Sequence, residues 1–165
     1  MYLRIQIKKE YDKPSTLTCT REDSSTTFSK LQANFEIHDI AHFVVEKHLK
    51  LKNAFYGLLA QGYQIDDFLI PKQKRPEALQ SQNLPPEALF TEHLVNLLTV
   101  DYMQSDTKMD IASMLEGILE GQKLPFPEKL KKQKIVLIQK ELSALMSKWD
   151  KLTAGNYLEL ILQIE

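Results

Sequence analysis

Apolar and polar residues alternate at both ends of the chain, as they do in strands with one buried face. At the amino end, Leu3 to Lys8 alternates, and two short runs rich in threonine follow at Thr16 to Arg21 and Thr26 to Leu31. At the carboxyl end, Tyr157 to Ile164 places leucine and isoleucine at every second position. A strand so close to a terminus is stable only within a larger sheet. We therefore expect it to join the amino-terminal strands.

Between these strands, apolar residues recur every three or four positions, which is the helical period. We predict one central helix from Glu36 to Gly62 and another beginning at Pro85 and Pro86. A third should begin at Thr107, with Asp110 three residues on in a variant of the capping box, and end at Gly121. The longest should run from Glu128 to about Leu152.

The connection from residue 63 to 83 lacks this period and contains Pro71 and Pro76, so we expect a surface excursion with a turn of helix around Glu77 to Gln80. Together these elements predict an α+β fold in a single domain spanning residues 1–165. Its small antiparallel sheet is built from residues 1–31 and 157–164 and is covered by about four helices.

Composition narrows the classes of protein. With 165 residues, 43% of them hydrophobic and 26% charged, the chain is typical of one globular domain. A net charge of -1 predicts neither nucleic acid nor an anionic membrane as a partner. The single cysteine, Cys19, excludes an intrachain disulfide and is typical of a reducing compartment. Without a signal peptide or an apolar run of membrane length, we expect a cytoplasmic protein.

The central helix carries the candidate chemistry. At about 100° per residue, His38, Asp39, His42 and Glu46 fall on one face, opposite the apolar stripe. Histidines one helical turn apart can direct ring nitrogens to one metal ion. The small residues Gly57 and Ala60, further along the same side, predict a cleft above the histidines.

The predicted metal ligands are His38, His42 and Glu46, and two imidazoles with a carboxylate suit a divalent transition metal such as Zn. Three side chains stacked over two turns cannot all reach one ion without strain, so Glu46 or Asp39 could instead orient an imidazole or act as a general base. Another element must then complete the site. His93 of the following helix is a candidate for that ligand.

The same residues also fit a structural role. Acidic residues near a helix start oppose the macrodipole, and histidines pack in amphipathic positions. His48 falls within the apolar arc, as a core or boundary histidine does. Asp66 and Asp67 either line the rim of the histidine cleft or terminate a helix. Cys19 lies in a predicted strand with no histidine near it in sequence, which disfavours a nucleophile.

The runs HDIAHFVVEKHL and NAFYGLLAQGYQIDDF resemble an uncharacterised group of small bacterial proteins with an H-D-x-x-H-[FY]-x-V-E segment followed by A-F-Y-G-L-x-A-x-G. The resemblance covers about residues 1–100 and implies that the histidine helix is the group's signature, without an established activity. Two better-known H-D patterns fit less well. Ubiquinone-biosynthesis proteins with H-D-x-x-H have a glutamate where this chain has Ala54, and HD-type phosphohydrolases have an upstream histidine, whereas none precedes His38.

Two functional hypotheses follow. In the first, the chain is a metal-binding protein with hydrolytic chemistry at residues 38–46. In the second, it is a non-enzymatic interaction or scaffold domain whose histidine face is structural. The sequence specifies neither a small-molecule nor a protein partner.

Overall fold

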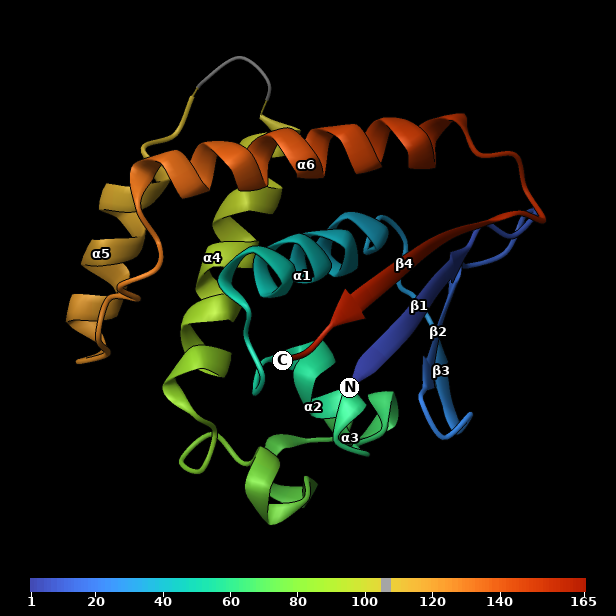
Figure 1. Cartoon of the computed structure of the whole chain (residues 1–165), viewed down its shortest axis with the longest axis horizontal. Coiled ribbons are helices and arrows are strands. Elements are labelled where there is room, and N and C mark those ends of the chain that lie inside the picture. Colours follow the sequence, from blue (N-terminus) through green and yellow to red (C-terminus); the bar gives the residue numbers. More distant parts are fainter. Residues whose placement is uncertain (105–107) are drawn as a thin grey trace.

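The computed structural model describes residues 1–104 and 108–165 and contains a four-stranded antiparallel sheet. The strand order is β3-β2-β1-β4, so the last strand pairs with the first and both termini lie at one sheet (Figure 1). The strands are β1 (Tyr2–Lys8), β2 (Thr16–Arg21), β3 (Thr26–Lys30) and β4 (Tyr157–Gln163). The predicted α+β fold, with the carboxyl-terminal strand in the amino-terminal sheet, is confirmed.

Helices cover one face of this sheet and account for most of the remaining chain. The α-helices are α1 (Glu36–Leu49), α2 (Phe55–Ala60), α3 (Ile65–Leu69), α4 (Pro86–Met103), α5 (Ile111–Gly121) and α6 (Lys132–Lys151). Two 3-10 turns, η1 (Lys72–Lys74) and η2 (Glu77–Leu79), lie in the predicted surface excursion. Helix α6 begins at Lys132 rather than Glu128, because the lysine-rich segment before it opposes the helix dipole.

The prediction of one central helix from Glu36 to Gly62 is wrong. Helix α1 ends where Lys50 adopts the left-handed conformation, with φ of 53°. The N–H groups of Lys50 and Leu51 both donate to the carbonyl of Glu46, which closes the helix. The chain then starts a separate helix, α2, whose first N–H groups turn back towards α1. The pattern of apolar residues does not predict this break, because the N–H groups of α2 bind a side chain of α1.

The core lies between the sheet and the helices. Leucine and isoleucine side chains from β1, β2 and β4 point to one side of the sheet, where they pack against α1 and its neighbours. Helix α1 is central: it packs against α4, α6, α2 and β4.

Among the described residues, no helix is both long and apolar enough to span a bilayer. The helix start predicted at Thr107 lies outside the described residues. Among the described residues, Asp110 is the N-cap of α5 and accepts a hydrogen bond from the N–H of Ser113.

Candidate metal site between α1 and α4

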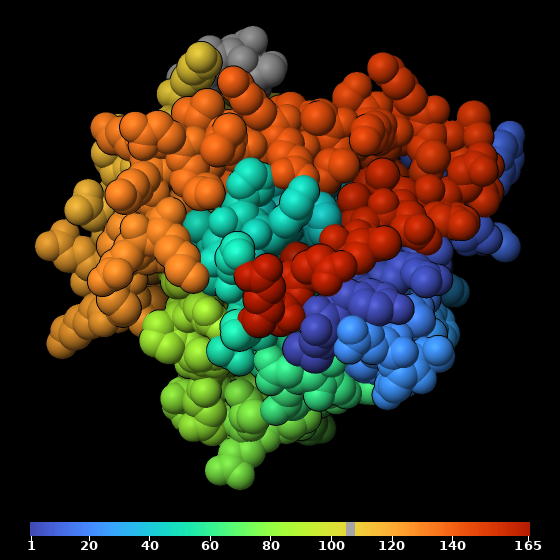
Figure 2. All heavy atoms as spheres, in the orientation of Figure 1, coloured from blue at the N-terminus to red at the C-terminus, as the bar shows by residue number. Residues whose placement is uncertain are grey.

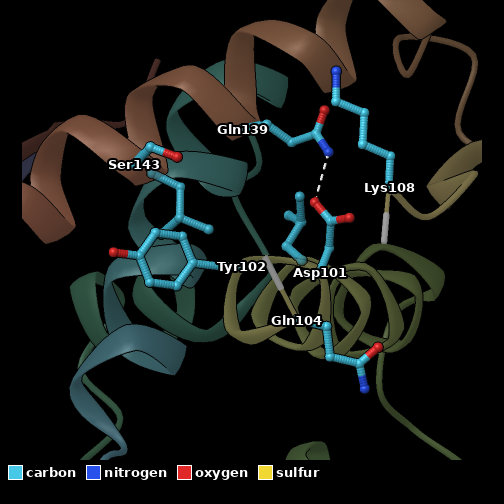
Figure 3. A pocket seen from close by; sticks show the side chains of 8 residues that line it. Asp101, Tyr102, Gln104, Lys108, Gln139 and Ser143 are labelled. Atoms are coloured by element: carbon cyan, nitrogen blue, oxygen red, sulfur yellow. Dashed lines mark hydrogen bonds between the residues drawn. The ribbon is translucent and has the colours of Figure 1, made fainter. Parts of the chain in front are cut away.

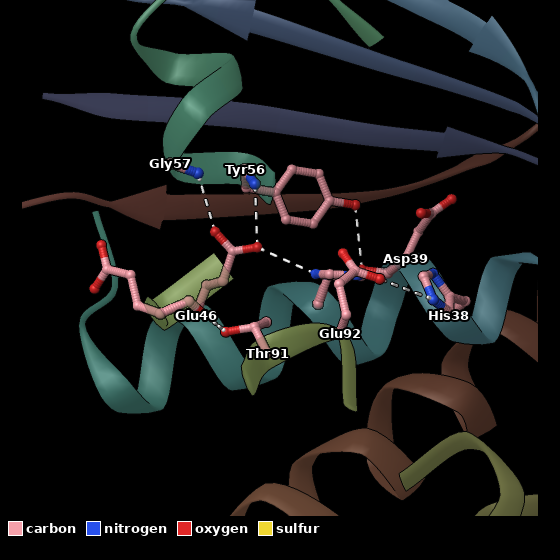
Figure 4. A network of polar contacts seen from close by, with 9 residues as sticks. His38, Asp39, Glu46, Tyr56, Gly57, Thr91 and Glu92 are labelled. Carbon is pink, nitrogen blue, oxygen red and sulfur yellow. Dashed lines mark hydrogen bonds and ion pairs between the residues drawn. The ribbon is translucent and has the colours of Figure 1, made fainter. Parts of the chain in front are cut away.

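Two helices bring three ligand-type side chains together. His38 and His42 lie one turn apart on α1, and Glu92 approaches them from α4 (Figure 4). One ligand atom from each of the three lies within 4.8 Å of the other two. The pairing of α1 with α4 therefore supplies the third group that α1 alone could not provide.

His42 lies at the middle of this arrangement, with 2% of its side chain exposed. Its Nε2 lies 3.3 Å from Glu92 Oε1, and its Nδ1 lies 3.4 Å from Glu46 Oε1. Burial favours the neutral ring, but the two carboxylates outweigh it and raise the pKa of His42 to about 10. Without a metal, His42 is an imidazolium held between two carboxylates.

His38 has the opposite electrostatics. Burial, together with the positive charge on His42, lowers the pKa of His38 to about 4, although Glu92 acts against the shift. Its Nε2 lies 4.0 Å from Glu92 Oε2, and its Nδ1 is buried without a hydrogen bond to any described residue. At neutral pH this is an uncharged imidazole, which is the form that binds metal ions.

Glu46 is fully buried and joins α1 to α2. Its carboxylate accepts hydrogen bonds from the N–H of Tyr56 at 3.1 Å and of Gly57 at 2.9 Å, which satisfies two free donors at the start of α2. This is the tertiary contact that breaks the predicted central helix. Glu46 is not among the three converging residues, and its contact with His42 Nδ1 is that of an orienting partner.

The space above Gly57 is filled by the chain itself. A β-carbon added at Gly57 would lie 2.3 Å from the carbonyl oxygen of Lys52. Glycine is present because a backbone segment passes close to it, so the prediction of a ligand cleft over Gly57 and Ala60 is wrong at this point.

Asp39 points into the interior and not towards the ligand cluster predicted for it. Its side chain is buried, and Oδ2 has no hydrogen-bond partner in the described part of the chain. Burial raises the pKa of Asp39 to about 7, with His42 acting against the shift and Glu36 and Glu92 adding to it. Its backbone carbonyl accepts the hydroxyl of Tyr56 at 3.2 Å. Asp39 therefore lies beside the site without belonging to the three converging groups.

The remaining candidates have other contacts. His93 places Nε2 2.9 Å from Gln122 Oε1 and is not part of the cluster. Asp67 accepts the N–H of Gln64 and caps α3, while Asp66 is exposed. His93 was predicted from the correct helix, but its neighbour Glu92 faces α1. The sequence contains no signal that chooses between them, because the choice depends on the rotation of α4 about its axis.

A separate hollow of about 290 Å³ lies between α4 and α6 (Figure 3). Its acidic group is already occupied: Asp101 accepts hydrogen bonds from Gln139 Nε2 at 2.8 Å and from the N–H of Met109 at 3.1 Å. These contacts connect α4 to α6 and to the segment before α5. The hollow therefore offers less free chemistry than the α1–α4 cluster.

Comparison with protein-family models, curated proteins and solved structures finds no match. The resemblance to the bacterial H-D-x-x-H group stays a prediction, and function must be argued from the geometry of the site.

The donor set of the cluster fits a transition metal. Two nitrogen ligands and one carboxylate are the set found in open zinc sites, and two ligands of a tetrahedral zinc lie about 3.3 Å apart. The separation of 3.3 Å between His42 Nε2 and Glu92 Oε1 matches this value. The 4.0 Å from His38 Nε2 is to the other oxygen, Glu92 Oε2, and the three ligand atoms lie within 4.8 Å of one another, so the widest separation would have to close by up to about 1.5 Å. The Nδ1 atom of half-buried His38 has no hydrogen-bond partner among the described residues, so no described group already occupies this nitrogen.

Proposed function

We propose that the protein binds one divalent transition metal, such as Zn, through His38, His42 and Glu92, in an open site suited to hydrolytic chemistry. The observation that carries the proposal is the convergence of these three groups from two packed helices. Two of the three were candidates on α1, and the third supplies the carboxylate that α1 by itself could not direct to the same point.

The surroundings of the three ligands support an open site. The side chain of Glu92 is 52% exposed, so solvent reaches the cluster on the α4 side. Catalytic zinc sites have three protein ligands and keep one position for water or substrate. A bound metal ion would supply a water of lowered pKa at that position. Glu46 would hold Nδ1 of His42, which leaves Nε2 directed to the metal.

The alternative is a structural ion-pair network in an interaction or scaffold domain. One observation favours it: Nδ1 and Nε2 of His42 lie 3.4 Å and 3.3 Å from carboxylate oxygens of Glu46 and Glu92, and these carboxylates raise the pKa of His42 and so favour a protonated ring. Metal binding must displace that proton. The metal hypothesis therefore predicts that added zinc raises the melting temperature, and the structural alternative predicts that it does not.

The test measures metal content and thermal stability together on untagged protein at neutral pH. We expect about one equivalent of zinc per chain and a melting temperature that rises with added zinc and falls with chelator. His38→Gln and Glu92→Gln should each lose the metal, and with it the zinc-dependent rise in melting temperature, while remaining folded.

The matched control is His93→Gln, which changes the histidine next to Glu92 that contacts Gln122 instead. This variant should bind zinc like the wild type. If wild-type protein binds no zinc, cobalt, nickel or manganese, and none of these ions raises its melting temperature, the metal hypothesis is wrong and the structural alternative holds. If the wild type binds zinc, hydrolysis is next sought with zinc-loaded protein, using His38→Gln as the blank.

A further inference from the structure

The two edges of the sheet are built differently. Strand β3 is short and ends with Lys30, and the neighbouring α3 contacts it where the N–H of Ile65 donates to Thr27 Oγ1 at 3.0 Å. Strand β4 has seven residues, contains neither lysine nor proline, and has one charged side chain, Glu159. Edge strands of proteins are normally protected by lysine, proline or a covering segment. Figure 2 shows the carboxyl-terminal segment, in red, uncovered on the surface.

The backbone of β4 has free hydrogen-bonding groups on its outer side. Just beyond the ends of the β1–β4 ladder, Ile164 N–H donates to Met1 and Lys9 N–H donates to Asn156, both at 2.9 Å. Antiparallel bonds alternate along a strand, so even-numbered residues of β4 bond to β1. The N–H and C=O groups of the odd-numbered residues face away from β1, and no described residue bonds to them. These residues are Tyr157, Glu159, Ile161 and Gln163.

We propose that β4 pairs with β4 of a second copy of this chain, antiparallel and centred on Ile161. In this register Ile161 faces its symmetry mate, and Glu159 faces Gln163 of the other copy, whose side-chain amide can donate to the carboxylate. Centring the pair on Glu159 would place two carboxylates opposite each other, which is unfavourable. The sequence of β4 is thus complementary to itself in one register.

The pairing agrees with the symmetry of homodimers. A two-fold axis through Ile161 makes each strand both donor and acceptor, which is the isologous contact of most dimers. The apolar residues of β4 stay on the helical side in both copies, so two four-stranded sheets become one of eight strands. The side chain of Ile161, 50% exposed in the isolated chain, would be covered. The dimer does not depend on the proposed metal site, which lies between α1 and α4.

The test follows the mass of the full-length chain by sedimentation across a range of concentrations. We expect reversible dimers. Ile161→Lys and Ile161→Glu should each raise the dimer dissociation constant about tenfold or more, because like charges then meet at the axis. An equimolar mixture of the two variants should recover dimers, since lysine then faces glutamate. That recovery is specific to the proposed register.

Phe28→Lys is the matched control, because Phe28 is an exposed apolar residue on the other edge strand. It should leave the dimer unchanged. If Ile161→Lys lowers the melting temperature, Ile161→Pro is the second variant, since the N–H that it removes lies on the open side of β4 and does not bond to β1. The proposal is overturned if the wild-type chain stays monomeric at every concentration. This holds even if its β4 edge then binds an extended peptide, because the occupant would not be a second copy of the chain. A dimer that survives both changes at Ile161 overturns it as well.

Discussion

Two histidines of helix α1, His42 and His48, form ion-pair contacts with carboxylates of different helices, and the two contacts differ in depth. His42 is nearly inaccessible and has a carboxylate near each ring nitrogen, Glu46 on α1 and Glu92 on α4. His48 is 17% exposed and has one partner, Glu141 of α6, at 2.7 Å. Glu141 is shared with Lys47, whose Nζ lies 2.6 Å away.

The comparison shows that a histidine with a nearby acid is not by itself a metal site. At His48 a lysine already neutralises the carboxylate, and solvent screens the contact, so the pair only connects α1 to α6. At His42 no described lysine forms an ion pair with either carboxylate, a second imidazole lies beside the ring, and burial makes each contact costly to break. The His42 contact therefore differs from the His48 contact in having two carboxylate partners for one ring and in being more deeply buried.

The largest expected effect is at Glu46. Glu46→Ala should lower the free energy of unfolding by about 3–5 kcal/mol, because it leaves His42 and two N–H groups of α2 without a buried partner. Glu141→Ala should cost less than about 1 kcal/mol. Urea denaturation of both variants and the wild type measures the difference. Equal losses would mean that the buried and half-buried contacts contribute alike.

Asp39 and Glu141 should respond to pH in opposite directions. Burial raises the pKa of Asp39 to about 7, so its favourable contribution is complete below the unfolded value of about 3.9 and is lost as pH rises towards 7. Glu141 is partly desolvated, but its hydrogen bonds to Lys47 and His48 hold its pKa below the usual value. Its contribution is present at neutral pH and is lost in acid as the carboxylate becomes protonated.

Asp39→Asn should therefore be more stable than the wild type at pH 8, by about 1–3 kcal/mol, and no more stable at pH 4. Glu141→Gln should lower stability at neutral pH, where the carboxylate contributes, and approach the wild type in acid. Urea midpoints from pH 4 to pH 8, with chelator present, test both. A wild-type profile that is unchanged by Asp39→Asn would contradict the assignment of a buried, protonated Asp39.

A further stability effect is expected at Gly57, whose N–H donates to the carboxylate of Glu46. Gly57→Ala should cost about 1–3 kcal/mol, since the new methyl group overlaps the carbonyl of Lys52. Gly117→Ala in α5 is the control, because open space surrounds that position and alanine favours helix by about 0.5–1 kcal/mol. Thermal melts of both variants should shift in opposite directions. A stabilising Gly57→Ala would show that the Lys52 segment moves aside easily.

Much of the fold followed from local patterns. The four strands were predicted to within about a residue. Successive side chains of a strand point to opposite faces, so a strand with one buried face has apolar residues at every second position. The start of α4 was signalled by Pro85 and Pro86, because proline lacks the N–H that the first turn of a helix leaves unpaired, whereas α6 begins at Lys132, four residues after the predicted Glu128. The carboxyl-terminal strand was expected to join the sheet because an isolated strand cannot bury its apolar side or pair its backbone groups.

The sequence also determined that His38 and His42 lie on one face of a helix, since spacing alone places them one turn apart. Only the tertiary structure decided the rest. Glu92 and not His93 meets these histidines because of how α4 is rotated against α1, and Glu46 turns to cap α2 because the chain folds back at Lys50. Both outcomes depend on groups distant along the chain competing for one buried partner, and local periodicity carries no information about that competition.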